Sequence, residues 1–135
     1  MPGFMTDYLN NKILDMVFGA APYTAPATLY IGLSTSASNK SGTAVEPSGG
    51  GYARVPLTNN IANFPIAIGG TKSNAAQVTF STPTADWGTI LSLFVADAPS
   101  GGNLLAMADL TIPMAINNGS VSARVAVGAL FLSHT

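Results

Sequence analysis

The sequence contains no cysteine and a single histidine, His134, the residue before the last. The absence of cysteine excludes disulfide scaffolds, thiolate metal sites and cysteine nucleophiles. A lone histidine cannot build a metal cluster within one copy, and chain termini are usually poorly held for catalysis. Most acid–base and nucleophilic chemistry needs histidine, cysteine or clustered carboxylates. We therefore expect that the protein is not an enzyme, and we assign no catalytic residue.

Charge is also scarce. Charged residues make up 8% of the 135 positions, against ~25% in a typical domain, and the net charge is -1. The basic residues are scattered along the chain rather than gathered in a stripe: Lys12, Lys40, Arg54, Lys72 and Arg124. Such a chain is not expected to bind nucleic acid or an acidic membrane surface. Low charge suits a subunit packed in many copies, because like charges on neighbouring copies repel; an ordinary neutral β domain is the alternative.

Long hydrophobic runs are missing as well. The longest, Ile90–Ala96 and Val125–Leu132, are far shorter than the ~18 residues of a membrane-spanning helix. The first residues lack the basic region and continuous apolar stretch of a secretory signal. We therefore expect a protein with no membrane partner, which stays where it is made until it is assembled.

Residues 1–26 predict one amphipathic helix followed by a linker. Thr6 is a suitable N-cap, and Gly19 suits the C-terminal stop. Pro22 and Pro26 prevent the helix from continuing. The apolar residues of this segment fall on one helical face: Leu9, Ile13, Met16 and Val17. Because a short isolated helix is marginal in water, this stripe should pack on its own domain or on a neighbouring copy.

Residues 27–135 predict a single antiparallel β-sandwich or a barrel-like domain. Period-two alternation or apolar runs indicate strands at Thr28–Thr35, Tyr52–Thr58, Ala75–Ser81 and Thr89–Ala96. Pro56 places the second of these at a sheet edge, and the fourth is apolar enough for a central strand. Residues 36–51 predict a polar loop, whereas residues 59–70 fit no single pattern. Several closely spaced strands without a second helix are typical of this mainly β class.

The last third predicts two turns. Pro99–Asn103 should join Leu91–Asp97 and Leu104–Leu110 into a hairpin. Asn117–Gly119 contains the Asn-Gly pair that tight turns favour. After it, apolar residues at alternate positions predict one long strand: Val121, Ala123, Val125, Val127, Ala129 and Phe131.

The aspartates predict structure rather than a metal site. Asp7 and Asp15 share the polar face of the predicted helix, where solvation explains their spacing better than a paired-carboxylate site. Asp86, Asp97 and Asp109 fall at predicted strand ends or turns, where aspartate bonds the local backbone. No Asp-x-Asp-x-Asp series points to calcium. We expect no metal and no cofactor.

Three further motifs also have a structural explanation. Ser48–Tyr52 is glycine-rich, but it lacks the Lys-Ser/Thr of a phosphate loop and precedes a predicted strand. The only tryptophan, Trp87, could stack on a ligand, although a partly buried aromatic that anchors a turn is the favoured interpretation. Asn118–Ser120 matches a glycosylation acceptor without an accompanying secretory signal.

Seven segments cover nearly the whole chain in a recognisable order: Met5–Leu9, Lys12–Asp15, Ala25–Leu33, Gly50–Arg54, Ala85–Gly88, Gly101–Leu105 and Asn117–Gly119. Together they resemble a family of small tailed-bacteriophage virion proteins that are commonly labelled phage tail fibre proteins. Asn60–Ser73 departs from that family by being more apolar, which is compatible with an interface. The resemblance supplies no catalytic motif.

The resemblance implies a structural virion protein that is assembled in the host cytoplasm. The small single domain fits a capsid cement or decoration protein, which would bind the major capsid protein and stabilise the head lattice. A tail or fibre component is the alternative within this class. A receptor- or glycan-binding module using Trp87, Tyr52 and loop asparagines is the alternative outside it. We expect a homo-oligomer, and capsid geometry rather than any residue suggests a trimer.

Overall fold

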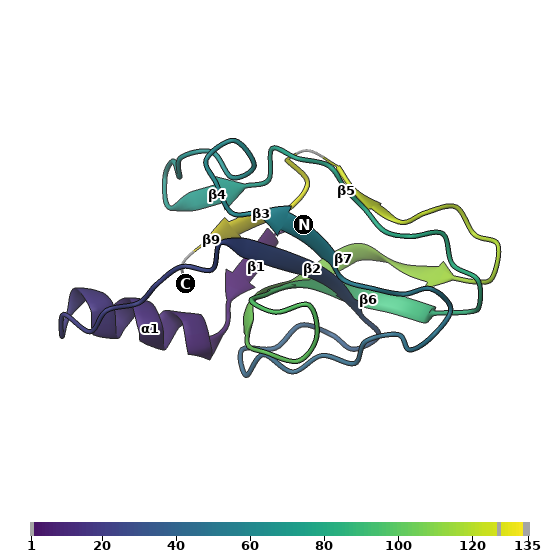
Figure 1. Ribbon diagram of the computed structural model, residues 1–135, viewed down its shortest axis with the longest axis horizontal. Coiled ribbons are helices and arrows are strands. Elements are labelled where there is room, and N and C mark those ends of the chain that lie inside the picture. Colours follow the sequence, from purple (N-terminus) through teal and green to yellow (C-terminus); the bar gives the residue numbers. More distant parts are fainter. Residues whose placement is uncertain (1, 127, 134–135) are drawn as a thin grey trace.

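The protein is mainly β, with one short helix near the N-terminus, as the sequence predicted. The computed structural model describes residues 2–126 and 128–133 (Figure 1), so the predictions for Val127 and His134 lie outside the described residues. Helix α1 comprises Asp7–Val17. The strands within these residues are β1 Pro2–Met5, β2 Thr28–Ser34, β3 Val55–Thr58, β4 Thr71–Ser73, β5 Val78–Thr79, β6 Gly88–Ala96, β7 Leu104–Ile116, β8 Arg124–Val125 and β9 Phe131–Ser133.

Seven strands form one sheet in the order β3-β2-β6-β7-β1-β9-β4. Neighbours are antiparallel except β1 and β9, which run parallel. The predicted hairpin is confirmed, since β6 pairs with β7 and Leu93 lies opposite Ala108. The predicted edge strand is confirmed too, because β3 ends the sheet and carries Pro56, which has no N–H to donate.

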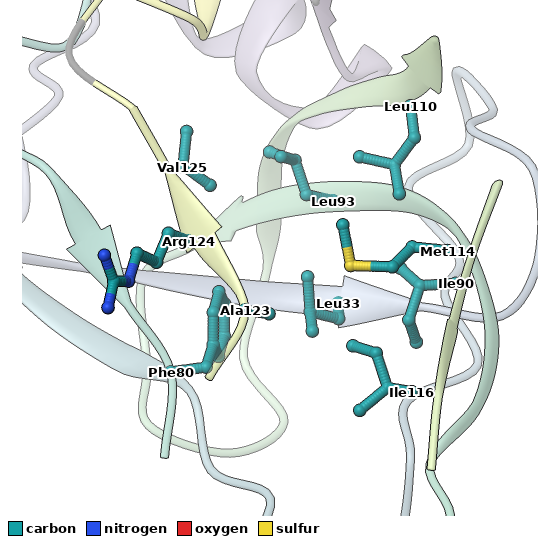
Figure 2. Close-up of a pocket in the computed structure, with 10 residues that line it drawn as sticks. All are labelled: Leu33, Phe80, Ile90, Leu93, Leu110, Met114, Ile116, Ala123, Arg124 and Val125. Carbon is teal, nitrogen blue, oxygen red and sulfur yellow. The ribbon is translucent and has the colours of Figure 1, made fainter. Parts of the chain in front are cut away.

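Strands β5 and β8 form a second, two-stranded antiparallel sheet. Figure 2 shows where the two sheets meet: Leu33, Ile90 and Leu93 of the large sheet face Phe80 and Val125 across a cavity of about 30 Å³. All five side chains are buried. The small antiparallel sheet packs on the larger, mainly antiparallel sheet and leaves only a small space between them, which agrees with the predicted mainly β sandwich.

The predicted long strand over Val121–Phe131 is wrong. Among the described residues of this range only β8 and β9 form, and between them the N–H of Ala129 donates to the carbonyl of Ala126. The buried side chain of Asn74 bends the chain at this point, because its Oδ1 accepts from the N–H of Leu130 and its Nδ2 donates to the carbonyl of Ala126. The alternation of apolar residues therefore does not reveal this bend, because the side chain that causes it, Asn74, lies far away in the sequence.

Strand β1 has no counterpart among the predicted elements. It lies between β7 and β9, with Gly3 opposite Ala108 on one side and Leu132 on the other. A Cβ on Gly3 would lie 2.8 Å from Cδ2 of Leu132 and 3.1 Å from the carbonyl oxygen of Met107. Glycine at this position therefore suits the close approach of the neighbouring strands, since a side chain would crowd Leu132 and the carbonyl of Met107.

Helix α1 begins where the sequence predicted. Thr6 is its N-cap, and its Oγ1 accepts from the N–H of Leu9 at 3.5 Å. The helix ends at Val17, and the residue that adopts a left-handed conformation beyond it is Ala20, with φ 54°, rather than Gly19.

The predicted burial of the helix stripe is only partly correct. Leu9 and Ile13 are half-buried, whereas Met16 and Val17 are exposed. The helix packs on β1 and β7 and then extends beyond the edge of the sandwich (Figure 1). Its first turns are therefore anchored, and its last turn is uncovered in a single copy.

Candidate functional site

The segment around Arg54 forms a buried polar network with Glu46. Nη2 of Arg54 lies 2.9 Å from Oε2 of Glu46, and Nε donates to Oε1 at 3.0 Å. Nη1 donates to the carbonyls of Ala98 and Gly101 at 2.7 and 2.9 Å, in the turn between β6 and β7. The Arg54 side chain is only 4% exposed, and its charge is paired with the partly exposed Glu46 carboxylate. Arg54 thus ties the long loop over residues 36–51 to this turn.

Tyr52 extends the network to strand β2. Its hydroxyl donates to Oε1 of Glu46 at 2.7 Å and accepts from the N–H of Leu33 at 3.0 Å. Burial is the largest effect on this phenol and raises its pKa far above 10, and the adjacent Glu46 carboxylate raises it further. Burial alone would also raise the pKa of Glu46, but hydrogen bonds from Arg54 and Tyr52 and the guanidinium charge hold it below its ordinary value. At neutral pH Glu46 is therefore ionised and Tyr52 is neutral, and the network stabilises the fold.

Trp87 is buried beneath this loop rather than presented to a ligand. Its side chain is 4% exposed, and its ring meets that of Tyr52 edge-on at 5.3 Å between centroids. Its Nε1 donates to the carbonyl of Gly50 at 2.9 Å. The interpretation as an anchor of a turn therefore fits, and Trp87 offers no face on which a sugar could stack. Three of the segments that carry the family resemblance are thus held together by the hydrogen bonds of Arg54 and Trp87: Gly50–Arg54, Ala85–Gly88 and Gly101–Leu105.

Asp86, Asp97 and Asp109 all accept from backbone N–H groups, but only Asp97, which follows β6, bonds its local turn as the sequence predicted. Asp86 precedes β6 and bonds a distant turn, and Asp109 lies within β7, so the predicted strand-end position is wrong for Asp109. Oδ1 of Asp86 accepts from the N–H of Asn118, and Oδ1 of Asp97 accepts from the N–H of Asn103. Oδ1 of Asp109 accepts from the N–H of Ser38 in the long loop. Each of these carboxylates is therefore occupied in holding a turn or a loop.

Two kinds of site are not found in the described part of the chain. Among residues 2–126 and 128–133, no group of three or more histidine, cysteine, aspartate or glutamate side chains could hold a metal ion. No helix within the same residues is long and apolar enough to cross a membrane.

Exposed apolar side chains form three surfaces that are candidates for contact with other proteins. The helix-end patch comprises Leu14, Met16, Val17 and Phe18. The loop patch comprises Ile61, Ile66 and Ile68, from the segment that departs from the family pattern. The strand patch comprises Ile112, Met114 and Val121, on β7 and the turn that follows it. Clustered exposed apolar residues are typical of protein–protein contact sites.

A groove lies beside the first turns of helix α1. It has a volume of about 400 Å³ and an almost wholly apolar lining: Met5, Leu9, Leu29, Asn59, Phe64, Ala67, Gly70, Thr71, Lys72, Val95 and Leu132. Its walls come from the helix, the large sheet and the loop before β4. Sequence reasoning missed this groove, because its lining residues are scattered from position 5 to position 132 and meet only in the fold.

Comparison with known families identifies the family of this chain. Residues 4–133 match the family described as podophage GP4 fiber I protein gp80. The chain belongs to this family. It is therefore a virion-associated structural protein of the phage tail-fibre type, and the resemblance noted in the sequence is confirmed. A comparison with curated proteins gave no match.

The family assignment and the fold account for most of the motifs. The match runs through the helix, the segments joined around Arg54 and Trp87, and the strands that line the groove. The residues that carry the resemblance therefore lie largely in structural positions, while the apolar patches and the groove remain the surfaces through which this chain can contact others.

Proposed function

We propose that this protein is a structural subunit of the phage's fibre apparatus, which joins other virion proteins through uncharged, apolar contacts and has no enzymatic activity. The match to a fiber I protein over residues 4–133 is the observation that carries this proposal. The match covers almost the full chain, which supports a single role for the whole domain.

The surface chemistry supports an assembly role. Phe18 is 81% exposed, Ile68 is 83% exposed and Ile112 is 77% exposed. Such side chains are costly to leave in water in a virion component, and they are well suited to burial between subunits. Partners are proposed to be another virion protein and further copies of this chain.

Nucleic acid is not proposed as a partner. Arg54 is engaged by Glu46 and two backbone carbonyls, so it is not available for phosphate binding. Affinity for nucleic acid depends on neutralised phosphates, and few positive charges remain for this purpose. The proposal also excludes a membrane surface as a partner, since basic clusters that attract anionic lipid are missing from the sequence.

The capsid cement role predicted from the sequence is the finer alternative, and one experiment separates it from a fibre role. Purified virions would be quantified for the copy number of this chain relative to the major capsid protein, and labelled with an antibody against it for electron microscopy. A fibre subunit should be present in few copies with label at the tail. Label over the whole head, with a copy number near that of the major capsid protein, would establish cement instead.

The glycan-binding alternative receives little support. Trp87 is buried, and the Tyr52 hydroxyl is bonded to Glu46 and to the backbone of Leu33. A glycan array with the intact protein should show no binding above background. Binding that is lost on Trp87→Phe would overturn this part of the proposal.

A further inference from the structure

The uncovered end of helix α1 is an apolar knob formed by Val17 and Phe18. Phe18 follows the last helical residue, and its N–H donates to the carbonyl of Leu14 at 2.8 Å, which fixes it to the helix. Its side chain is 81% exposed and lies next to Val17, which is 59% exposed. An uncovered aromatic side chain on a backbone that is held to the helix is suited to burial by a partner.

The groove beside the helix is a receptor of matching chemistry on the same molecule. Phe64, Leu29 and Leu132 form part of its lining, and its volume of about 400 Å³ lies in the range of pockets that enclose ligands. It is large enough for an aromatic ring with a neighbouring aliphatic side chain.

The knob cannot enter the groove of its own chain. Leu9 lines the groove, and Phe18 stands at the far end of the same helix, about 14 Å further along a rigid axis. Figure 1 shows helix α1 pointing away from the sandwich, with β4 and β9 on the same side of the molecule. Knob and groove are therefore both presented on one side, where a second copy can meet them.

The distribution of charge also favours a second copy of this chain as the occupant of the groove. No charged residue occurs from Met16 to Asn39 on the knob side, and none from Val55 to Thr71 on the groove side. The last helical turn carries Asp15 and no basic residue, with Lys12 one turn earlier, and the helix dipole adds negative character at this end. The charged residue that lines the groove is Lys72. Apart from this one pair of opposite signs, the two surfaces are neutral and apolar.

We propose that copies of this chain associate by inserting Phe18 and Val17 of one copy into the groove of the next, with Asp15 facing Lys72 across the contact. The contact joins two different surfaces, so it either closes into a symmetric dimer or ring or continues as a chain of subunits. It goes beyond the proposed fibre role, because it names the self-association surface and does not depend on where in the virion the protein resides.

The test is the molar mass of the full chain in solution, measured by sedimentation equilibrium from micromolar to millimolar concentrations. Wild-type protein should self-associate. Phe18→Ser should raise the dissociation constant by about tenfold or more, as loss of an interfacial aromatic anchor does. Filling the groove with Ala67→Trp should have the same effect. A mixture of these two variants should associate again, because one partner keeps an open groove and the other keeps its knob.

Ile112→Ser is the matched control, because it removes an equally exposed apolar side chain from a different surface. It should self-associate like the wild type. Charge reversal gives an independent arm: Asp15→Lys and Lys72→Glu should each weaken association, and the double variant should restore it. Circular dichroism melts of every variant confirm that the fold is intact, and Phe18 and Asp15 are exposed, so their substitution should not unfold the chain.

Each outcome decides the proposal. Association that depends on Phe18, Ala67 and the charge pair, but not on Ile112, supports it. A wild-type protein that remains monomeric at millimolar concentration overturns it, as does self-association that Ile112→Ser abolishes and Phe18→Ser leaves intact. The virion location experiment can fail without affecting this result, so the two proposals are tested separately.

Discussion

The indole Nε1 of Trp87 donates a hydrogen bond of 2.9 Å to the backbone carbonyl of Gly50. This contact joins two segments that are 37 residues apart and holds the end of the long loop against the sandwich. It requires close approach, because a Cβ on Gly50 would lie 3.0 Å from Nε1 and 3.1 Å from Cδ1 of Trp87. Gly50 also has φ 61°, which disfavours any other residue.

Gly50→Ala should therefore lower the free energy of unfolding by about 2–4 kcal/mol, from the left-handed backbone and from overpacking against Trp87. Gly49→Ala is the matched control, since Gly49 has φ 72° but no heavy atom within 4 Å of an added Cβ. That control should cost only about 1–2 kcal/mol. Urea unfolding of both variants gives the comparison, and equal losses would mean that the contact with Trp87 adds nothing.

Glu46 should make stability depend on pH in the acid range. Its pKa in the folded protein lies below the ordinary value of 4.5, so the native state holds this proton less tightly than the unfolded chain does. The stabilisation is complete above pH 4.5 and is lost as the pH falls through the lowered folded-state value.

Glu46→Gln should therefore cost about 1–3 kcal/mol at neutral pH, because the buried Arg54 loses its charged partner. Unfolding measured from neutral to acid pH should show this difference between wild type and variant shrinking below pH 4.5. In an Arg54→Met background the same substitution should have little further effect. A difference that is constant with pH would contradict the role assigned to this carboxylate.

Gly32 and Phe94 should show strongly non-additive substitutions. Gly32 lies opposite Phe94 across β2 and β6, and an added Cβ would lie 2.2 Å from Cζ of the Phe94 ring. Phe94 is fully buried, and the guanidinium carbon of Arg54 lies over its ring at 5.0 Å from the centroid. The ring therefore has little room to move.

Gly32→Ala should cost at least about 3 kcal/mol, at the upper end of overpacking effects. In a Phe94→Leu background the same change should cost clearly less, because the clashing ring atoms are gone. A double-mutant cycle by denaturant unfolding measures the coupling, which we expect to be about 1–3 kcal/mol. Additive losses would show that the ring is not what excludes a side chain at position 32.

The two ends of helix α1 should respond differently to polar substitution. Leu9 packs against the core, whereas Val17 is 59% exposed at the end of the helix. Leu9→Ser should lower the free energy of unfolding by about 1–3 kcal/mol, while Val17→Ser should change it by less than about 0.5 kcal/mol at concentrations where the protein is monomeric. Thermal melts of dilute protein provide the test. Similar losses at both positions would mean that the last turn is also covered within one copy.

Local chemistry made much of the fold predictable from sequence. Leu29, Ile31 and Leu33 alternate, and all three are buried in β2. Pro56 has no N–H, and its strand lies at the sheet edge. These predictions succeeded because each depends on residues that are adjacent along the chain.

The candidate surfaces could be predicted only in part. The sequence revealed the apolar stripe of the helix and the unusual apolar loop, but the structure decided that Phe18 is exposed and that Phe64 is buried. Burial depends on which distant segment covers a side chain, and no period in the sequence carries this information.

By itself, the sequence determined that this is a mainly β virion protein with one amphipathic helix, because periodicity, turn residues and the order of motifs are all local. Tertiary structure alone decided that β1 enters the sheet between β7 and β9, that Asn74 splits the last predicted strand, and that Trp87 is buried under Gly50. The groove also exists only in the fold, since positions 5 and 132 must meet to form it. These features depend on contacts between residues far apart in the chain. Such contacts form only when the sheets pack, so no local pattern in the sequence predicts them.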